Sequence, residues 1–207
     1  QFKVTCPDLS VIGLNLFLEL AVYIRIPPCD PLEELVFDID QLPGEDLGAT
    51  VDVAVTPGGV LGFVGLDGIV RGVNPQDGRY LGTIFQTEAM ETPVAIAFSD
   101  DFGFVADSGG QIHAFNASNG ATIGLAQSEL LQPVDLAVGT DGVAWATSSN
   151  NEAGLHAWDP RSGEMQVPFE GGFPGFDEPG PLTVLPDGSP LVVDLADSEI
   201  YRFDVRS

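Results

Sequence analysis

Residues Ile112-His113-Ala114-Phe115-Asn116 form the motif that decides the fold, because the chain repeats its pattern three more times. The other copies are Val70-Arg71-Gly72-Val73-Asn74, Leu155-His156-Ala157-Trp158-Asp159 and Ile200-Tyr201-Arg202-Phe203-Asp204. The first three copies run on to glycines spaced 42 and 43 residues apart, at Gly78, Gly120 and Gly163. A period of this length is typical of a four-stranded propeller blade. The repeats therefore predict an all-β fold, a small β-propeller, with almost no helix.

Each repeat shows the same order of apolar strands and polar turns. In the second repeat we expect strands at residues 94–98, 102–106, 112–116 and 121–126, separated by turns rich in Asp and Gly. In the third repeat the matching strands are residues 134–138, 143–147, 155–158 and 164–169. Apolar residues fall on both sides of these strands, as expected when every sheet packs between two neighbours.

Three stretches of these repeats resemble a known family. They are Pro133-Val134-Asp135-Leu136-Ala137-Val138, Val105-Ala106-Asp107-Ser108 and the pair Ile112 and Phe115. Over residues 50–207 the chain resembles the NHL and gluconolactonase-like propeller repeats. The resemblance implies the blade but no single function, because such repeats serve lactone hydrolases, lyases, receptors and passive scaffolds. The metal-binding Glu and Asn positions of the gluconolactonase-like enzymes have no clear counterpart here.

The fourth repeat stops at Ser207, one residue before its expected glycine, so its sheet lacks an outer strand of its own. Residues 32–40, with the apolar core Leu35-Val36-Phe37, can supply that strand and so avoid an unpaired edge. We therefore expect four blades closed by residues 32–40 as the outer strand of the last blade. The propeller would then span residues 32–207, with an N-terminal β arm at residues 1–31. An incomplete arc that a second subunit completes is the alternative.

The arm has an alternating apolar pattern. Its even positions are all apolar: Leu14, Leu16, Leu18, Leu20, Val22, Ile24 and Ile26. This period of two favours a long strand. A membrane-spanning helix is less favoured, because the apolar run is short and contains Glu19 and Arg25. A strand with one apolar face must pack on its own propeller, for example in a hairpin with residues 32–40, or join a neighbouring subunit. The second option predicts a homo-oligomer or homopolymer.

The charge of the chain excludes one class of partner. There are 31 Asp and Glu residues against seven Lys and Arg residues, which gives a net charge of −24. Such a chain repels a nucleic-acid backbone. The same self-repulsion is relieved by salt or divalent cations, so we expect either a saline or calcium-rich setting or the ordinary solubility of an acidic secreted protein.

Cys6 and Cys29 are the only cysteines, and both lie in Pro-containing turns at the ends of the arm. We expect them to form a disulfide, worth about 3 to 4 kcal/mol, which would require an oxidising compartment. The chain begins at Gln1 and so is interpreted as a mature exported product. Asn116-Ala117-Ser118 matches a glycosylation sequon in an expected turn, although Asn also suits turns for structural reasons.

Few residues suggest chemistry. His113 and His156 occupy the same place in successive repeats, where Arg71 and Tyr201 stand in the others, so we expect structural roles and not a shared metal. Asp52 and Asp135 begin inner strands and are weak candidates for binding a cation such as calcium. Hydrogen bonding to the backbone of a neighbouring blade is the favoured alternative. Their equivalents in the other repeats are predicted to be Ala95 and Thr183. Asp107 and Asp194, together with Thr147, are interpreted as turn caps.

No nucleophile elbow, phosphate loop, Cys-His cluster or zinc-protease motif occurs in the sequence. The longest loops, at residues 148–154 and 171–180, are predicted to form a binding rim that contains Phe173, Phe176, Asp177 and Glu178, and tolerated insertions are the equal alternative. The sequence favours a secreted, non-catalytic propeller that assembles through its arm. The alternatives are a small cation-dependent lactonase- or lyase-like enzyme and a membrane-anchored receptor head.

Overall fold

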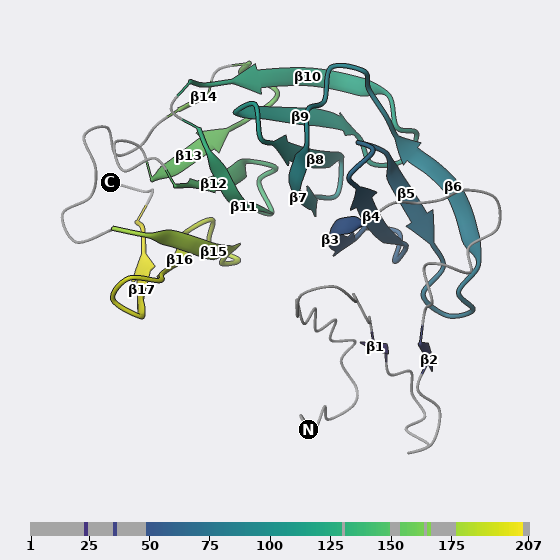
Figure 1. Ribbon diagram of the computed structural model, residues 1–207, viewed down its shortest axis with the longest axis horizontal. Helices are drawn as coiled ribbons and strands as arrows, with labels where there is room; N and C mark the ends of the chain where they lie inside the picture. Colours follow the sequence, from purple (N-terminus) through teal and green to yellow (C-terminus); the bar gives the residue numbers. More distant parts are fainter. Residues whose placement is uncertain are drawn as a thin grey trace.

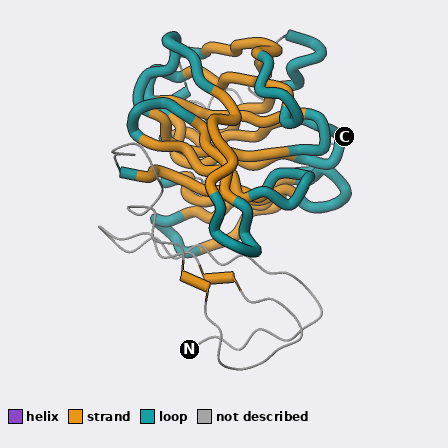
Figure 2. Tube along the Cα trace, turned by 90° about the vertical axis from the view of Figure 1, so that its right-hand side faces the viewer, coloured by secondary structure: helices purple, strands orange, loops and turns teal. Residues whose placement is uncertain are grey.

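The computed structural model describes residues 23–24, 35–36, 49–129, 131–149, 154–163, 165–166 and 177–204. This part of the chain contains only strands, turns and loops (Figure 2). No helix that could cross a membrane is found among these residues.

Four antiparallel sheets account for most of the described residues. The first sheet contains β3 (Thr50–Val55), β4 (Leu61–Gly65), β5 (Val70–Val73) and β6 (Tyr80–Phe85). The second contains β7 (Pro93–Phe98), β8 (Phe102–Asp107), β9 (Gln111–Asn116) and β10 (Thr122–Gln127). The third contains β11 (Pro133–Val138), β12 (Ala144–Ser148), β13 (Leu155–Trp158) and β14 (Met165–Gln166). The fourth contains β15 (Pro179–Val184), β16 (Pro190–Asp194) and β17 (Glu199–Arg202). The strands predicted for the second and third repeats are therefore confirmed to within a residue or two wherever the structure describes them.

The repeated glycine has a structural reason in the turn that follows the motif strand. Gly78, Gly120 and Gly163 have φ values of 69°, 69° and 74°, in the left-handed region that favours glycine. The Gly120 N–H donates to the Asn116 carbonyl at 2.8 Å, and the matching bonds close the other two turns. Any side chain at Gly120 would also collide with the Ile84 carbonyl oxygen on β6 of the preceding sheet. The repeated glycine thus permits the same turn in three sheets, and at Gly120 it also lets the second sheet approach the first.

The four sheets stand side by side in an arc (Figure 1). Their innermost strands β3, β7, β11 and β15 contact one another in that order. The first and fourth sheets lie at the two ends of the arc (Figure 1). The described residues thus form an open arc and no closed sheet.

A separate two-stranded sheet lies outside the arc in both views (Figures 1 and 2). It contains β1 (Tyr23–Ile24) and β2 (Leu35–Val36), paired antiparallel with Tyr23 opposite Val36. This pairing agrees with the hairpin between the arm and residues 32–40 that the sequence left open. It places β2 beside β1, and no pairing of β2 with β17 is found among the described strands. The predicted closure of the last blade therefore remains a prediction.

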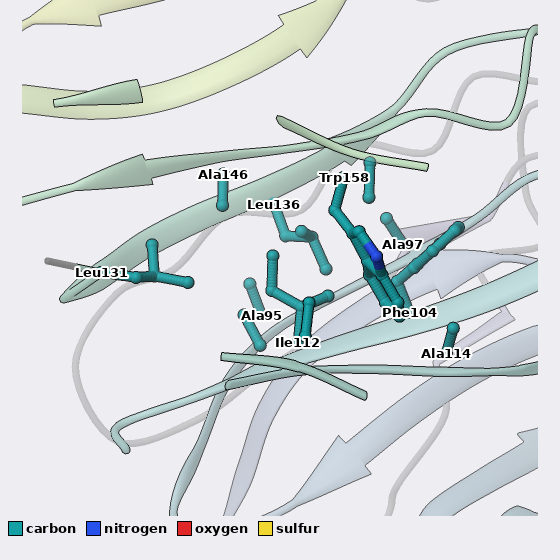
Figure 3. Close-up of a cluster of buried hydrophobic side chains, with 12 residues drawn as sticks. Ala95, Ala97, Phe104, Ile112, Ala114, Leu131, Leu136, Ala146 and Trp158 are labelled. Carbon is teal, nitrogen blue, oxygen red and sulfur yellow. The ribbon is translucent and has the colours of Figure 1, made fainter. Parts of the chain in front are cut away.

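Apolar clusters fill the spaces between successive sheets. The cluster between the second and third sheets contains Phe104, Ile112 and five alanines of the second sheet, packed on Leu136, Ala144, Ala146 and Trp158 of the third (Figure 3). The Phe104 and Trp158 rings meet edge to face with centroids 6.1 Å apart. Between the first and second sheets, Phe85 stacks on Phe115 at 4.4 Å. The core is thus a series of layers between sheets, as the apolar residues on both sides of the strands predicted.

Candidate functional site

Asp52, one of the two predicted cation candidates, joins two sheets. It lies on the innermost strand of the first sheet. One of its carboxylate oxygens accepts a hydrogen bond from the Val53 N–H at 2.8 Å. The other accepts from the Ile96 N–H on β7 of the second sheet, also at 2.8 Å. The carboxylate therefore links the backbones of the first and second sheets.

Asp135 makes the same connection two sheets further on. Its oxygens accept from the Leu136 N–H at 2.8 Å and from the Leu182 N–H on β15 at 2.7 Å. The hydrogen bond to a neighbouring blade, which the sequence favoured at these aspartates, is confirmed at both positions.

The pKa values of these two aspartates are shifted by their surroundings. Burial raises the pKa of both Asp52 and Asp135 above 3.8, and the charge of Asp135 adds to the rise at Asp52. The backbone hydrogen bonds oppose this rise without cancelling it. Two carboxylates could be part of a site for a hard cation such as calcium, which takes six to eight oxygen ligands. Within the described ranges, no group of three or more His, Cys, Asp or Glu side chains is placed to hold a metal ion.

The strand register corrects one predicted equivalence. Ile96 pairs with Val105, and Leu182 pairs with Val192, so these two residues hold the same place in the second and fourth sheets. The residue before each is Ala95 or Pro181, and Pro181 is therefore the equivalent of Asp52. The prediction of Thr183 was wrong, because it ignored the irregular register between Pro179 and Leu182. Thr183 pairs with Leu191 and takes the place of Ala97.

His113 has the structural role that the repeat predicted. Its Nε2 lies 2.9 Å from Oδ2 of Asp107, and both side chains are buried. Asp107 also accepts N–H bonds from Glu91, Gly109 and Gln111 at 3.0 to 3.1 Å. The histidine therefore stabilises a turn within its own sheet.

The position of His113 carries a polar partner of a carboxylate in two other sheets. Arg71 pairs with Asp67, with Nη2 and Oδ2 2.6 Å apart, and its side chain is buried. Tyr201 donates its hydroxyl to Glu199 at 2.9 Å, which raises the pKa of Tyr201 to about 12. His156, at the same position in the third sheet, is fully buried. These side chains stabilise their own sheets and do not converge on one centre.

Asp107 and Asp194 cap equivalent turns, as predicted. Asp194 accepts N–H bonds from Asp177 at 2.7 Å and from Ala196 at 2.8 Å. Burial acts to raise the pKa of each aspartate, but the hydrogen bonds they accept outweigh it and hold both values below 3.8.

The turn-cap prediction was wrong for Thr147, because Ser148 takes the equivalent place and accepts from the Gln132 N–H at 2.9 Å. Thr147 instead donates to the Gly180 carbonyl of the fourth sheet at 2.8 Å.

The predicted binding rim is only partly described. Asp177 and Glu178 are exposed, and their backbones are tied to the end of β16 through Asp194 and Leu195. Phe173 and Phe176 lie outside the described residues, as do Cys6, Cys29 and the arm residues apart from Tyr23 and Ile24.

Asn116 has a clear local function in its turn. Its side-chain oxygen accepts from the Ser118 and Asn119 N–H groups at 2.9 and 3.0 Å. Asn74 and Asp159 make the matching bonds in the first and third sheets. The recurrence of Asn or Asp here is thus explained by turn geometry, and glycosylation of Asn116 remains a prediction.

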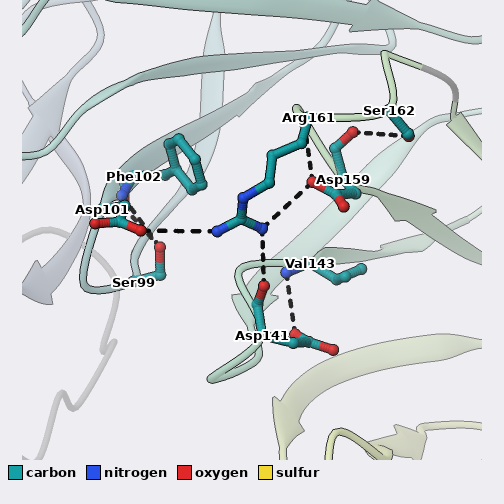
Figure 4. A network of polar contacts seen from close by, with 8 residues as sticks. All are labelled: Ser99, Asp101, Phe102, Asp141, Val143, Asp159, Arg161 and Ser162. Carbon is teal, nitrogen blue, oxygen red and sulfur yellow. Dashed lines mark hydrogen bonds and ion pairs between the residues drawn. The ribbon is translucent and has the colours of Figure 1, made fainter.

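Arg161, in the turn between β13 and β14, links the third sheet to the β7–β8 turn of the second (Figure 4). Its guanidinium lies 4.8 Å from the centre of the Phe102 ring and 3.7 Å from an Asp101 oxygen, both in the second sheet. It also donates to the Asp141 carbonyl at 2.9 Å. Because this side chain is half exposed, its contribution to stability is modest.

The most unusual surface is one side of the fourth sheet, which we call the open face. In the second sheet, the residues that pack on the third sheet are Ala95, Ala97, Phe104, Ala106, Ile112 and Ala114. By register, the same positions in the fourth sheet are Pro181, Thr183, Leu191, Val193, Ile200 and Arg202. Pro181, Thr183, Ile200 and Arg202 are exposed, and Leu191 and Val193 are half-buried. The open face is therefore an inter-sheet surface without a described sheet against it.

Ile200 makes the difference quantitative. Its counterparts Val70, Ile112 and Leu155 are 0%, 0% and 2% exposed, whereas Ile200 is 70% exposed. Sequence reasoning missed this surface, because Ile200 matches the motif as well as the other three residues do. The available signal was Arg202, a long charged residue at the position of Gly72, Ala114 and Ala157.

Searches with the sequence give no relative: no family model matches the chain, and no curated protein matches it. Solved structures do resemble it. The β-propeller domain of Cps50 (Swd1) from Myceliophteria thermophila matches with a TM-score of 0.68 at 15% identity, covering 95% of this chain and 66% of that one. Virginiamycin B lyase from Staphylococcus aureus matches with a TM-score of 0.61 at 14% identity, covering 97% and 75%. The WD40 repeats of RRP9 match with a TM-score of 0.58 at 16% identity, covering 78% and 52%.

These similarities, together with four antiparallel sheets set side by side, establish the β-propeller fold. At such low identity they establish the fold alone, and they do not single out the NHL or gluconolactonase-like family. The chain spans about half the length of the RRP9 structure and two thirds of the Swd1 domain. The described arc thus corresponds to a part of those propellers.

Proposed function

We propose that this protein is a non-catalytic, extracellular β-propeller that acts as a structural or adhesive building block and assembles through its N-terminal arm. The observation that carries the proposal is that four buried or half-buried carboxylates hold the backbone. Asp52 and Asp135 each connect two sheets, and Asp107 and Asp194 each hold a turn. Charged groups engaged in this way support a rigid scaffold and leave its surfaces to provide the function.

Self-assembly is supported by the pattern of the arm. Its even positions from Leu14 to Ile26 are apolar, and such a strand needs a partner surface. Residues 32–40 can complete the fourth sheet within one chain, or a second subunit can complete the arc. In the first case the N-terminal region supplies the strand that the fourth sheet lacks.

A pair of arm variants tests this proposal. Leu16→Asp combined with Leu20→Asp places two charges on the apolar side of the arm, and Asn15→Asp places one on the mixed side. Electron micrographs of the purified full-length protein should show filaments or rings for the wild type and for Asn15→Asp, and neither for the double variant. Unchanged assemblies in the double variant would refute the role of the arm.

Extracellular location rests on Cys6 and Cys29, and on the acidic surface. If the two cysteines form a disulfide, the denatured protein should react with a thiol reagent only after reduction. Reaction without reduction, in protein purified from its native source, would count against export to an oxidising compartment.

A cation-dependent lactonase- or lyase-like enzyme is the second candidate. One observation favours it: the negative charge of Asp135 contributes to the raised pKa of Asp52, so the two carboxylates are close enough to interact electrostatically. Calcium would then raise the thermal midpoint, and Asp52→Asn would remove this effect. Turnover of lactone or uronic-acid substrates that chelation abolishes would establish this alternative over the scaffold.

A further inference from the structure

The open face of the fourth sheet is built like an interface that this chain makes three times. Wherever a sheet follows along the chain, the position of Ile200 is at most 2% exposed. Its partners at the interface are apolar side chains of the next sheet, as Leu136 and Trp158 are for Ile112. What fits such a face is therefore another sheet of the same kind.

The two ends of the arc differ in this respect. On the first sheet, the side turned away from the second sheet carries Phe63 and Val73, and each is only 3% exposed. That side is not open to a further sheet. A head-to-tail chain of copies, with the fourth sheet of one on the first sheet of the next, would need both ends to be open. The only arrangement that joins open faces alone is a two-fold one.

The one charged residue of the open face permits such a contact. Arg202 pairs with Asp187, in the turn between β15 and β16, at 2.5 Å. The Arg202 charge is thus balanced within the chain. Each molecule as a whole still carries a charge of −24, so two copies repel at long range.

We propose that the open face docks on the same face of a second copy, with Pro181, Leu191, Val193 and Ile200 at the centre of a two-fold dimer. This inference rests on the proposed function, since it names a partner for an assembling module. It uses a surface other than the arm, so the two proposals can fail separately. Because salt screens the net charge, docking strengthens as ionic strength rises.

Substitution of an exposed residue tests the dimer without disturbing the fold. Ile200→Lys changes a side chain that is 70% exposed, and Ile123→Lys, on the outer strand β10, changes one that is 41% exposed. Both are made in the full-length chain, in the wild type and in the Leu16→Asp and Leu20→Asp background. Thermal melts should show that all variants fold alike.

Sedimentation velocity over a range of concentrations, at low and high salt, gives the readout. We expect the arm variant and its Ile123→Lys derivative to be dimers at high salt. We expect Ile200→Lys to weaken dimerisation by roughly a hundredfold, because a two-fold contact loses the apolar residue twice. A mixed pair of one Ile200→Lys chain and one chain without it should be weakened by only about tenfold.

A monomeric arm variant, or a dimer that Ile200→Lys leaves intact, would overturn the docking proposal. Association of the arm variant into a growing series of species that Ile200→Lys leaves unchanged would also overturn it, since a two-fold contact stops at two copies. Large assemblies that persist in the arm variant but lose their paired subunits on Ile200→Lys would refute the arm and support the docking face.

Discussion

The second and fourth sheets are built from the same repeat and yet have different surroundings. Both place an isoleucine at the start of the motif strand, and both hold the turn before it with a buried aspartate. Ile112 is buried between sheets and Ile200 is exposed. The comparison shows that the repeat specifies how a blade folds, whereas burial of its second side depends on what stands beside it.

The two sheets also differ where a small side chain meets the neighbouring sheet. Ala114 packs against the third sheet, and the equivalent Arg202 reaches along the surface to Asp187 and Ser189. Thr183 similarly replaces Ala97. The fourth sheet has thus kept its apolar centre and gained polar residues beside it, as expected for a surface that meets water as well as a partner.

Exchange of the residues that distinguish the two sheets should produce the largest effect. Ala114→Arg places a charged side chain in a filled interface, and we expect a loss of more than about 4 kcal/mol, enough to prevent folding. Arg202→Ala should change the free energy of unfolding by less than about 1 kcal/mol, because the ion pair it removes is half exposed. Urea unfolding measures both. A folded Ala114→Arg protein of normal stability would mean that the second and third sheets do not pack as described.

Truncation of the equivalent apolar residues should give a smaller contrast. Phe104→Ala removes a fully buried ring and should cost about 3 to 5 kcal/mol. Leu191→Ala, at the same register in the half-buried strand β16, should cost about 1 kcal/mol. Equal losses in urea unfolding at low protein concentration would show that the open face is covered within the single chain.

Substitution of the turn caps should have nearly the same effect on stability in the second and fourth sheets, and this is the smallest difference expected between them. The folded pKa of both Asp107 and Asp194 is lowered, so each stabilises the fold at pH values above the ordinary Asp pKa of 3.8. That stability is lost as the pH falls from 3.8 through the lower folded pKa values. Asp107→Asn and Asp194→Asn should therefore each reduce stability at neutral pH and flatten its dependence on pH below 3.8, to a similar extent.

Asp52 and Asp135 act in the opposite direction in the same experiment. Their folded pKa values are raised, so the folded state binds protons more readily than the unfolded state as the pH falls towards 3.8. Their contribution to stability therefore increases on acidification within that window. If Asp52→Asn left the dependence of stability on pH unchanged, the raised pKa of Asp52 would be contradicted.

The repeat allowed most of the fold to be predicted, and the reasons for the failures are local. Strand positions in the second repeat followed from alternating apolar residues and Asp- or Gly-containing turns. Thr183 was misaligned because β15 carries an irregular register between Pro179 and Leu182 that spacing alone does not reveal. Thr147 was assigned to its own turn, although its hydroxyl reaches the next sheet at Gly180.

The candidate surface was harder to predict than the fold. Ile200 belongs to the motif, and a motif does not record whether a neighbouring sheet is present. In the sequence, the fourth copy of the motif differs in that Ile200 is followed two residues later by Arg202, a large charged residue at a position where a small residue packs in the other sheets.

Hydrogen exchange of β9 and β17 in the full-length protein tests the central claim most directly. The account predicts that the β17 amides exchange faster than those of β9 at low protein concentration, because β17 is the edge strand of the described fourth sheet and one side of that sheet is exposed. It also predicts that protection of β17 rises with protein concentration and salt, while that of β9 stays constant. Equal protection of the two strands at every concentration would contradict both the open face and its docking to a second copy.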